Sequence, residues 1–168
     1  MFAHRTTPRL VSAAAAVLTA AALVLVPVPG AHADGAPRAI HSYLDYTKCL
    51  EVADWRTDDG APVRIWTCHG GANQQWIRTD NEEFVNVNSG KCLDVPNYST
   101  EPGTPIVQWT CNRGLNQAWQ MMRYTWHTEW FGVNVNSRLN MDVFEANPAD
   151  GTPVIQWPGY SGYNQRWS

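Results

Sequence analysis

Basic residues and histidines are scarce in most of this 168-residue chain. Residues 34–168 hold ten Lys and Arg against fifteen Asp and Glu, a formal net charge of −5. Nucleic acids and anionic membranes attract basic surfaces, so this balance argues against both as partners. The histidines of this stretch are His41, His69 and His127, and their spacing matches neither a catalytic triad nor a metal site. The sequence therefore predicts no metal and no cofactor.

A second long apolar run is also lacking, and the first one lies at the N-terminus. Residues 10–26 are almost purely Ala, Val and Leu, they follow a basic start, and Pro27 and the Ala31-His32-Ala33 segment come after them. This order is typical of a secretory signal peptide over residues 1–33. An uncleaved membrane anchor is the alternative, although the run is slightly shorter than the roughly 18 residues of a spanning helix. We expect a secreted, extracellular protein whose mature chain does not insert into a membrane.

Close cysteine pairs, which zinc sites use, are absent as well. All four cysteines follow the apolar run, and an even number behind a signal peptide indicates disulfides. Cys49 and Cys68 are 19 positions apart, and so are Cys92 and Cys111. This regularity favours those two pairs among the three connectivities open to four cysteines. Each bond would close a loop of about 20 residues and stabilise the fold by roughly 3 kcal/mol.

What the sequence does contain is one unit repeated three times. The acidic residue, the strand Trp and the Asn of each unit keep a constant spacing: Trp66 lies 15 positions and Asn73 lies 22 positions after Glu51, and the other two copies repeat both distances. Five extra residues separate the second and third copies, within residues 120–130. The segments that align are KCLEV (48–52), GAPVRIWTC (60–68) and NQQW (73–76); KCLDV (91–95), GTPIVQWTC (103–111) and NQAW (116–119); LNMDV (139–143), GTPVIQWPG (151–159) and NQRW (164–167).

The repeated unit has the pattern of short strands and turns. Residues 84–88 and 133–136 alternate apolar and polar side chains, and a Gly-x-Pro turn at Gly60, Gly103 and Gly151 precedes each Trp strand. No segment after residue 33 shows sustained helical periodicity. The prediction is an all-β domain of about twelve short strands, four per copy. One unit cannot bury its apolar face alone, so three must close around a shared axis.

The end of each copy carries the motif Gln-x-Trp, at residues 74–76, 117–119 and 165–167. With the Cys-Leu-acid-Val starts and the paired cysteines, this threefold motif resembles the ricin B-chain family of β-trefoil lectins, a carbohydrate-binding module also attached to many bacterial xylanases. The resemblance covers residues from about 40 to 168. It implies a pseudo-threefold β-trefoil over residues 41–168, with repeats at about 41–83, 84–130 and 131–168, after a short linker at 34–40.

The resemblance also implies up to three shallow sugar sites. Each would use the acid of the Cys-Leu-acid segment, the strand aromatic and the Asn before Gln-x-Trp, with the Gln supporting them from behind. The candidate residues are Asp94, Trp109, Asn116 and Gln117 in copy two; Asp142, Trp157, Asn164 and Gln165 in copy three; and Glu51, Trp66, Asn73 and Gln74 in copy one.

These side-chain types suit a sugar. A ring covers the apolar C–H face of a pyranose, a carboxylate accepts strong hydrogen bonds from two hydroxyls, and an amide both donates and accepts. The expected function is a non-catalytic lectin module, active as a monomer, that binds glycans of polysaccharides or glycoproteins. Family relatives take galactose-type, xylan or arabinan ligands.

Departures from the pattern rank the three copies. Glu51 is one methylene longer than the Asp of the other copies, which displaces its carboxylate by about 1.5 Å and disturbs a shallow site. Copy one also has Arg64 where the others have Val or Ile. Copy three has Asn140 and Gly159 at the cysteine positions. We therefore expect copy two to bind best, copy three next and copy one least.

Several residues also allow a purely structural interpretation. The Trp of each Gln-x-Trp motif is expected in the core, namely Trp76, Trp119 and Trp167. The strand tryptophans could be packing residues, and the acids could cap turns. Gln108 and Gln156 stand one position before the strand Trp, so strand alternation turns them to the opposite face.

Other functions on the same fold remain as alternatives. A β-trefoil can act as a protease inhibitor or protein-interaction module with degenerate sugar sites, or as an adhesion unit. The aromatic-rich residues 120–130 could contact a protein, or pack over one end of the domain. An inhibitor has no reason to keep the acid, Trp and Asn in all three copies. A glycosidase is disfavoured, because it would need two carboxylates facing each other across a cleft.

Overall fold

Eleven short strands and five single 3₁₀ turns form the described part of the chain, residues 35–123 and 128–168 of the computed structural model. These residues belong to one compact unit. The expected signal peptide, residues 1–33, lies outside the described residues, as do residues 124–127 of the insertion. Within the described residues, no helix has the length and apolarity to cross a membrane.

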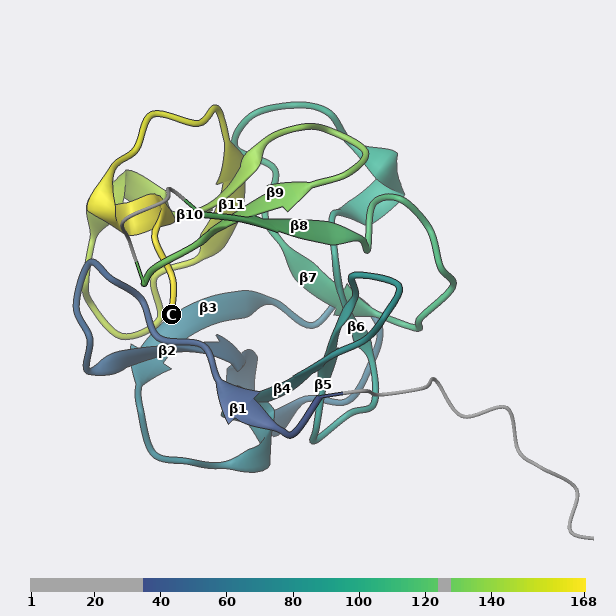
Figure 1. Ribbon diagram of the computed structural model, residues 1–168. Helices are drawn as coiled ribbons and strands as arrows, with labels where there is room; N and C mark the ends of the chain where they lie inside the picture. The colour runs from purple at the N-terminus through teal and green to yellow at the C-terminus, as the bar shows by residue number, and fades with distance from the viewer. Residues whose placement is uncertain (1–34, 124–127) are drawn as a thin grey trace, which may run out of the picture. The chain divides into compact units, whose positions relative to one another are not determined.

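The strands pair antiparallel, in sheets of five, four and two strands, and paired strands are consecutive in sequence except that β1 pairs with β4. Figure 1 shows three hairpin units around a common centre. The strands are β1 (Arg38–Ala39), β2 (Lys48–Val52), β3 (Val63–Thr67), β4 (Gln75–Arg78), β5 (Phe84–Asn86), β6 (Cys92–Asp94), β7 (Val107–Trp109), β8 (Trp119–Met122), β9 (Phe131–Asn134), β10 (Asn140–Val143) and β11 (Val154–Trp157). The turns are η1 (Ala53–Trp55), η2 (Ala72–Gln74), η3 (Pro96–Tyr98), η4 (Phe144–Ala146) and η5 (Tyr163–Gln165).

The all-β expectation is confirmed, with eleven strands where about twelve were expected. Copy two has the expected four strands, copies one and three have three each, and β1 lies before copy one. One missing strand is at the end of copy three. There Trp167 makes isolated bridges to Ser42 and Trp130 instead of forming a strand. The first bridge joins the last residues of copy three to the start of copy one, so the three copies close on themselves.

The predicted linker at residues 34–40 ends earlier than expected. Arg38 and Ala39 form β1 and pair with β4, and Ile40 is 1% exposed within the core. The apolar Ile40 reaches the core because the backbone beside it is held in the five-stranded sheet.

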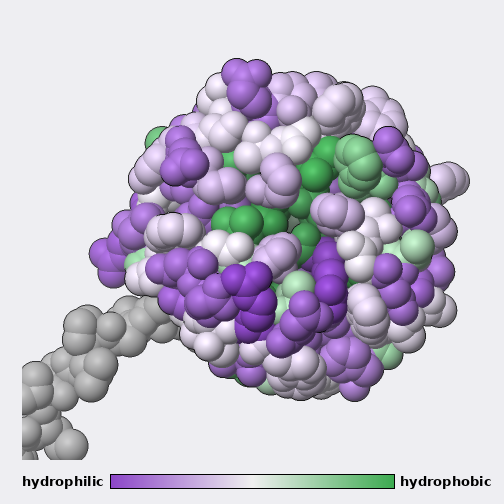
Figure 2. Space-filling view, turned by 180° about the vertical axis from the view of Figure 1, so that it is seen from behind, coloured by the Kyte–Doolittle hydropathy of each residue, from purple (hydrophilic) through white to green (hydrophobic). Residues whose placement is uncertain are grey.

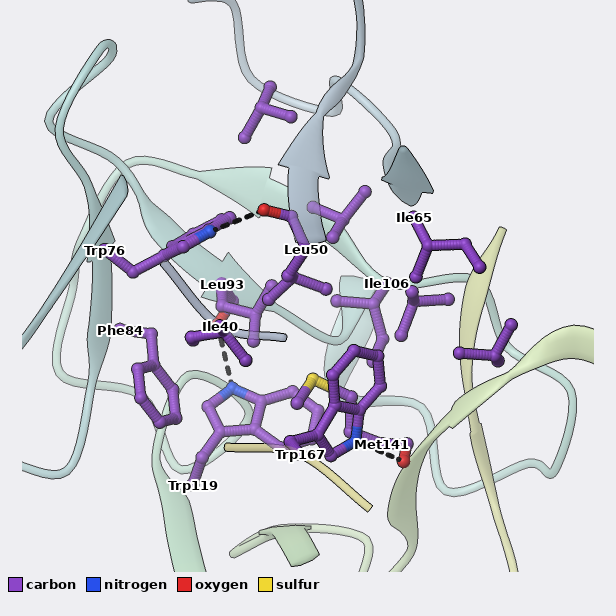
Figure 3. Close-up of a cluster of buried hydrophobic side chains, with 14 of the residues drawn as sticks. Ile40, Leu50, Ile65, Trp76, Phe84, Leu93, Ile106, Trp119, Met141 and Trp167 are labelled. Atoms are coloured by element: carbon purple, nitrogen blue, oxygen red, sulfur yellow. Dashed lines mark hydrogen bonds between the residues drawn. The ribbon is translucent and has the colours of Figure 1, made fainter. Parts of the chain in front are cut away.

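The three Gln-x-Trp tryptophans form the centre of the core, as predicted (Figure 3). Trp76, Trp119 and Trp167 are completely buried. Each indole Nε1 donates to a carbonyl of the acid-bearing strand of its own copy, at 3.0, 3.1 and 3.2 Å. Burying a large side chain of this kind contributes about 2–3 kcal/mol, and the bond satisfies its polar atom. The acceptors are Leu50, Leu93 and Met141.

Both predicted disulfides are present. Cys49 bonds Cys68 and Cys92 bonds Cys111, each with a Cα–Cα distance of 5.1 Å. In copies one and two each bond joins the first strand of the hairpin to the segment just after the second strand. In copy three Asn140 and Gly159 stand at the two cysteine positions, and Asn140 Nδ2 donates to Gln165 Oε1 at 3.1 Å.

A carboxylate links neighbouring copies at two of the three junctions. Asp59 of copy one accepts from the backbone N–H of Thr110 at 2.8 Å and pairs with Lys91 of copy two at 2.7 Å. Asp150 of copy three makes the same contacts, at 2.7 Å each, with Thr67 and Lys48 of copy one. At the junction of copies two and three the aligned residues are Pro102, Leu139 and Pro158. Those side chains are uncharged and Pro158 has no N–H, so this junction lacks the carboxylate contact.

The described ends of the insertion pack against the domain. Trp130 is 3% exposed and stacks on Phe84 with ring centroids 5.6 Å apart, and Met121 packs on the core cluster. The rest of the surface is mainly hydrophilic when seen from behind, with hydrophobic residues gathered near the centre of that face (Figure 2).

Candidate carbohydrate-binding sites

In copy two the predicted acid, amides and ring come together at the end of the β6–β7 hairpin. Asp94 is 3% exposed, and its Oδ2 accepts from Asn116 Nδ2 at 3.0 Å and from Gln117 Nε2 at 2.7 Å. Gln117 also binds the backbone of the hairpin loop, donating to Thr110 O at 3.1 Å and accepting from Asn112 N at 2.9 Å. The Gln therefore fixes the carboxylate and the loop in one orientation.

These residues line an open pocket whose walls are aromatic. Trp109 and Tyr98 are 43% and 52% exposed, and both line the pocket with Asp94 and Asn116. Among the described residues, no donor reaches Asn116 Oδ1, although this atom is buried. Buried polar atoms normally have partners, and the aligned Asn73 Oδ1 of copy one is unpaired as well, so this feature belongs to the repeated fold rather than to one pocket.

Copy three has the same arrangement of acid and amides, and other aromatic residues line its pocket. Asn164 Nδ2 donates to Asp142 Oδ1 at 2.9 Å and Gln165 Nε2 donates to Asp142 Oδ2 at 2.7 Å. Here the Asn oxygen is paired, because Tyr160 Oη donates to Asn164 Oδ1 at 2.8 Å. The exposed rings of this pocket are those of Phe144, Trp157 and Tyr160.

The turn after each acid has an unusual backbone. In every copy two successive non-glycine residues have φ between 51° and 57°, in the left-handed region. Such residues cost on the order of 1 kcal/mol or more each and gather at ligand sites. Here they place Tyr98 in the pocket with Asp94 in copy two, and Trp55 on His69 in copy one. The residues are Asp54 and Trp55, Asn97 and Tyr98, and Glu145 and Ala146.

The pockets of copies two and three each rest on the preceding copy. Gln108 and Gln156 are fully buried, while the tryptophans that follow them are about two-fifths exposed, as the alternation predicts. Each Gln amide donates to two carbonyl oxygens of the preceding copy at 2.9–3.1 Å. The rings are therefore held by a loop from a neighbour. The acceptors are Arg56 and Asp58 for Gln108, and Ser99 and Glu101 for Gln156.

Copy one has the same residues, but they are already occupied. Arg64 lies directly opposite Glu51 in the β2–β3 ladder, and its Nε and Nη2 donate to Glu51 Oε1 at 3.1 and 2.9 Å. His69 Nε2 and Gln74 Nε2 contact the other oxygen at 3.2 and 2.9 Å. The guanidinium carbon of Arg64 also lies 4.3 Å from the centroid of the Trp66 ring. One side chain therefore covers both the carboxylate and the ring.

Asn73 differs from its two counterparts. Its Nδ2 donates to Val52 O at 3.2 Å. In copies two and three the corresponding amide also reaches the acid, at 3.0 and 2.9 Å. The longer Glu51 side chain directs its oxygens toward Arg64, His69 and Gln74 instead.

Burial raises the pKa of Asp94 and of Asp142, and the hydrogen bonds from the Gln and Asn amides oppose this rise. A raised pKa means that each site loses its negative charge at a higher pH than an exposed Asp would. Only the ionised carboxylate accepts hydrogen bonds from two hydroxyls with both oxygens.

The sequence did not single out three ring residues of the pockets, Tyr98, Phe144 and Tyr160. A signal for Tyr98 was present, because Tyr98 and Trp55 each stand four positions after the acid of their copy. Tyr160 stands 18 positions after Asp142, a place held by Asn112 in copy two. Residue type varies at that place, so the repeat alone does not reveal it.

Comparison with solved structures places the fold among lectin domains. A designed threefold-symmetric protein, ThreeFoil, is 34% identical, with a TM-score of 0.73 over 77% of this chain and 94% of the other. An exo-β-1,3-galactanase from Clostridium thermocellum is 29% identical, with a TM-score of 0.74 over 80% of this chain. The match covers 30% of that enzyme, so this chain corresponds to one part of it. The C-half of an earthworm R-type lectin in complex with GalNAc shares the fold at 16% identity, with a TM-score of 0.64 over 77% of this chain and 94% of the other.

Among curated proteins, a probable lipoprotein of Salmonella typhimurium is 40% identical over 35 residues, which is 21% of this chain and 20% of that protein. The chain therefore spans a fifth of that relative. The ricin-type β-trefoil lectin domain matches residues 36–167, nearly all of the chain beyond the apolar N-terminal run. The chain belongs to the ricin-type β-trefoil lectin domain family.

Proposed function

We propose that the chain is a secreted, non-catalytic lectin that binds sugar residues of polysaccharides or glycoproteins through copies two and three. The observation that carries this proposal is the same in both copies. A buried carboxylate and an amide face an open pocket walled by exposed aromatic rings. This set matches the rim of hydroxyls and the apolar face of a pyranose.

The proposal leaves copy one out. A sugar hydroxyl would have to displace Arg64 from Glu51, and a sugar ring would have to displace the same side chain from Trp66. The Glu51 side chain is 3% exposed, and a buried ion pair is costly to break. Copy one therefore serves as a structural element of the trefoil.

In copy two a binding role fits the pocket better than a hydrolytic one. Among the residues that line the pocket of copy two, Asp94 is the single acid, whereas glycoside hydrolysis uses a pair of carboxylates. The two disulfides support an extracellular location. Galactose-type sugars are the first ligands to test, and xylan and arabinan come next.

The test is a binding screen of the mature protein on a glycan array and on immobilised galactan, xylan and arabinan. Millimolar binding per site, about −4 kcal/mol, is expected, with higher avidity on polymers because two sites share one rigid body. The free monosaccharide should compete, and no reducing sugar should be released. A folded, disulfide-bonded sample that binds none of these glycans would overturn the proposal and favour a protein partner.

A further inference from the structure

A group of tyrosines lies outside the three aligned pockets, at the seam where copy three closes on copy one. Tyr43 and Tyr163 stack with ring centroids 6.1 Å apart, and Tyr46 meets Tyr43 edge-on at 6.3 Å. Their exposed fractions are 36% for Tyr43, 59% for Tyr46 and 61% for Tyr163. These three residues are called the tyrosine platform below.

The platform is held from several sides. The backbone N–H of Tyr43 donates to Arg166 O at 2.8 Å, and the guanidinium of Arg166 lies 4.9 Å from the centroid of the Tyr163 ring. Tyr46 stacks on His41 at 5.0 Å and accepts at its hydroxyl from Ser168 Oγ at 3.0 Å. The rings are therefore positioned before any ligand arrives, which lowers the entropy cost of binding.

The other two seams do not have such rings. The residue before the aligned Asn is Tyr163 in copy three, Ala72 in copy one and Leu115 in copy two. Tyr43 corresponds to Val87 and Val135, because each of these N–H groups donates to the carbonyl of the middle residue of a Gln-x-Trp motif. Neither the fold nor closure of the trefoil requires tyrosine at these positions, since aliphatic residues occupy them elsewhere.

The platform begins at the edge of the copy-three pocket. Tyr163 immediately precedes Asn164, whose amide binds Asp142. The loop turns so tightly here that a Cβ on Gly162 would meet both Asn164 Oδ1 and the Tyr160 ring at 2.5 Å. Tyr160 and Tyr163 both have exposed rings on this loop, and Tyr163 stacks on Tyr43 of copy one.

We propose that the tyrosine platform extends the copy-three site, so that this site binds several consecutive residues of a glycan chain rather than one sugar. The inference rests on the proposed function. One sugar residue occupies the pocket at Asp142, and the following residues lie on Tyr163 and Tyr43. Arg166 lies over the Tyr163 ring as Arg64 lies over the Trp66 ring, but Tyr163 stays 61% exposed whereas Trp66 is partly buried, so a sugar can still reach the Tyr163 ring. The hydroxyl of each Tyr can also bind the rim of a pyranose. Copy two, with Leu115 and Val135 at the corresponding positions, binds a single sugar residue.

The test measures affinity against chain length, by calorimetry with galactose and β-1,3-linked galacto-oligosaccharides of two to four residues, and with the xylose series as the second probe. Asp94→Ala isolates copy three. In that background we expect the tetrasaccharide to bind about tenfold more tightly than the monosaccharide, a difference of ~1.4 kcal/mol. Asp142→Ala isolates copy two, where chain length should have no effect.

Two substitutions use residues that the other seams already contain. Tyr163→Leu and Tyr43→Val, together in the Asp94→Ala background, should remove the tenfold gain and leave monosaccharide affinity unchanged. Leu115→Ala is the matched control and should change neither value. Thermal unfolding verifies that each variant is folded.

The outcomes separate the platform from the proposed function. If monosaccharide binds to copy three but chain length has no effect, or if the gain survives the double tyrosine substitution, the platform is refuted and the lectin function stands. If no sugar binds to the wild-type protein, both the lectin function and the proposed role of the platform are refuted.

Discussion

Removing Arg64 should convert copy one into a third binding site. The variant Glu51→Asp/Arg64→Val gives copy one the pair that faces across the hairpin in copy two, where Asp94 lies opposite Val107. It shortens the acid by one methylene and uncovers the Trp66 ring, from which the Arg64 guanidinium carbon now lies 4.3 Å.

The cost of Arg64→Val alone follows from the burial of its ion pairs. Breaking a fully buried pair costs about 3–5 kcal/mol, and breaking an exposed one costs about 0–1 kcal/mol. The Glu51 side chain is 3% exposed and that of Arg64 is 18% exposed, while Asp54, its second partner, is 73% exposed. His69 and Gln74 keep contacts with Glu51 after the change. The expected loss is therefore intermediate, about 2–3 kcal/mol, and chemical denaturation measures it.

Binding stoichiometry is the decisive readout. The ligand for this NMR titration is a monosaccharide that the wild-type protein binds. The titration should show two occupied sites in the wild-type protein and three in the variant. The dissociation constant of the third site should be near millimolar, and its occupation should shift the signal of the Trp66 indole N–H. The reciprocal variant Val107→Arg places a guanidinium opposite Asp94 and should reduce two sites to one. The reasoning is refuted if copy one binds no sugar in the folded Glu51→Asp/Arg64→Val variant and copy two still binds sugar in the Val107→Arg variant.

Three further predictions concern the disulfides, the acids and the core. Replacing both Cys92 and Cys111 by Ser should lower the free energy of unfolding by roughly 3 kcal/mol in urea titrations; an unchanged midpoint would contradict this. Sugar binding should weaken as pH falls through the raised pKa of Asp94 and Asp142, because protonation removes the acceptor charge. The same protonation should favour the folded state, since a raised pKa makes these two acids contribute stability at low pH that is lost as pH rises. Calorimetry from pH 7 to 3 measures the loss of binding. The difference in thermal unfolding between the wild-type protein and the Asp94→Ala/Asp142→Ala variant isolates the stability trend of these two acids, because the lowered pKa of Asp45, Asp58, Asp59 and Asp150 makes those acids act in the other direction. A stability difference that falls with pH together with binding would refute the assignment. Trp119→Ala should destabilise the domain by about 3–5 kcal/mol, and a loss below 1 kcal/mol would show that the ring is not part of the central core.

The repeat made the architecture predictable. A constant spacing of acid, Trp and Asn indicated equal units, and a unit with one apolar face needs partners. The indole of each Gln-x-Trp motif was correctly assigned to the core, and the spacing of 19 residues identified both disulfides. Strand alternation also predicted that Gln108 and Gln156 turn inward.

Features that join different copies were not predictable from the repeat. Asp59 and Asp150 contact neighbouring copies, and the tyrosine platform joins residues from the two ends of the described chain. Sequence spacing within one unit carries no information on such contacts. Copy one is an intermediate case. The sequence shows that Arg64 departs from the pattern of the other copies. Its pairing with Glu51 follows only from the cross-strand register, in which the two residues lie directly opposite each other.

The most direct test of the central claim compares glycan binding by the mature protein and by the Asp94→Ala/Asp142→Ala double variant, on galactan and xylan, with thermal unfolding as a check on folding. Removal of the two carboxylates should abolish binding, because both pockets are organised around them. Full binding by a folded double variant would contradict the assignment of these two pockets as the sugar sites.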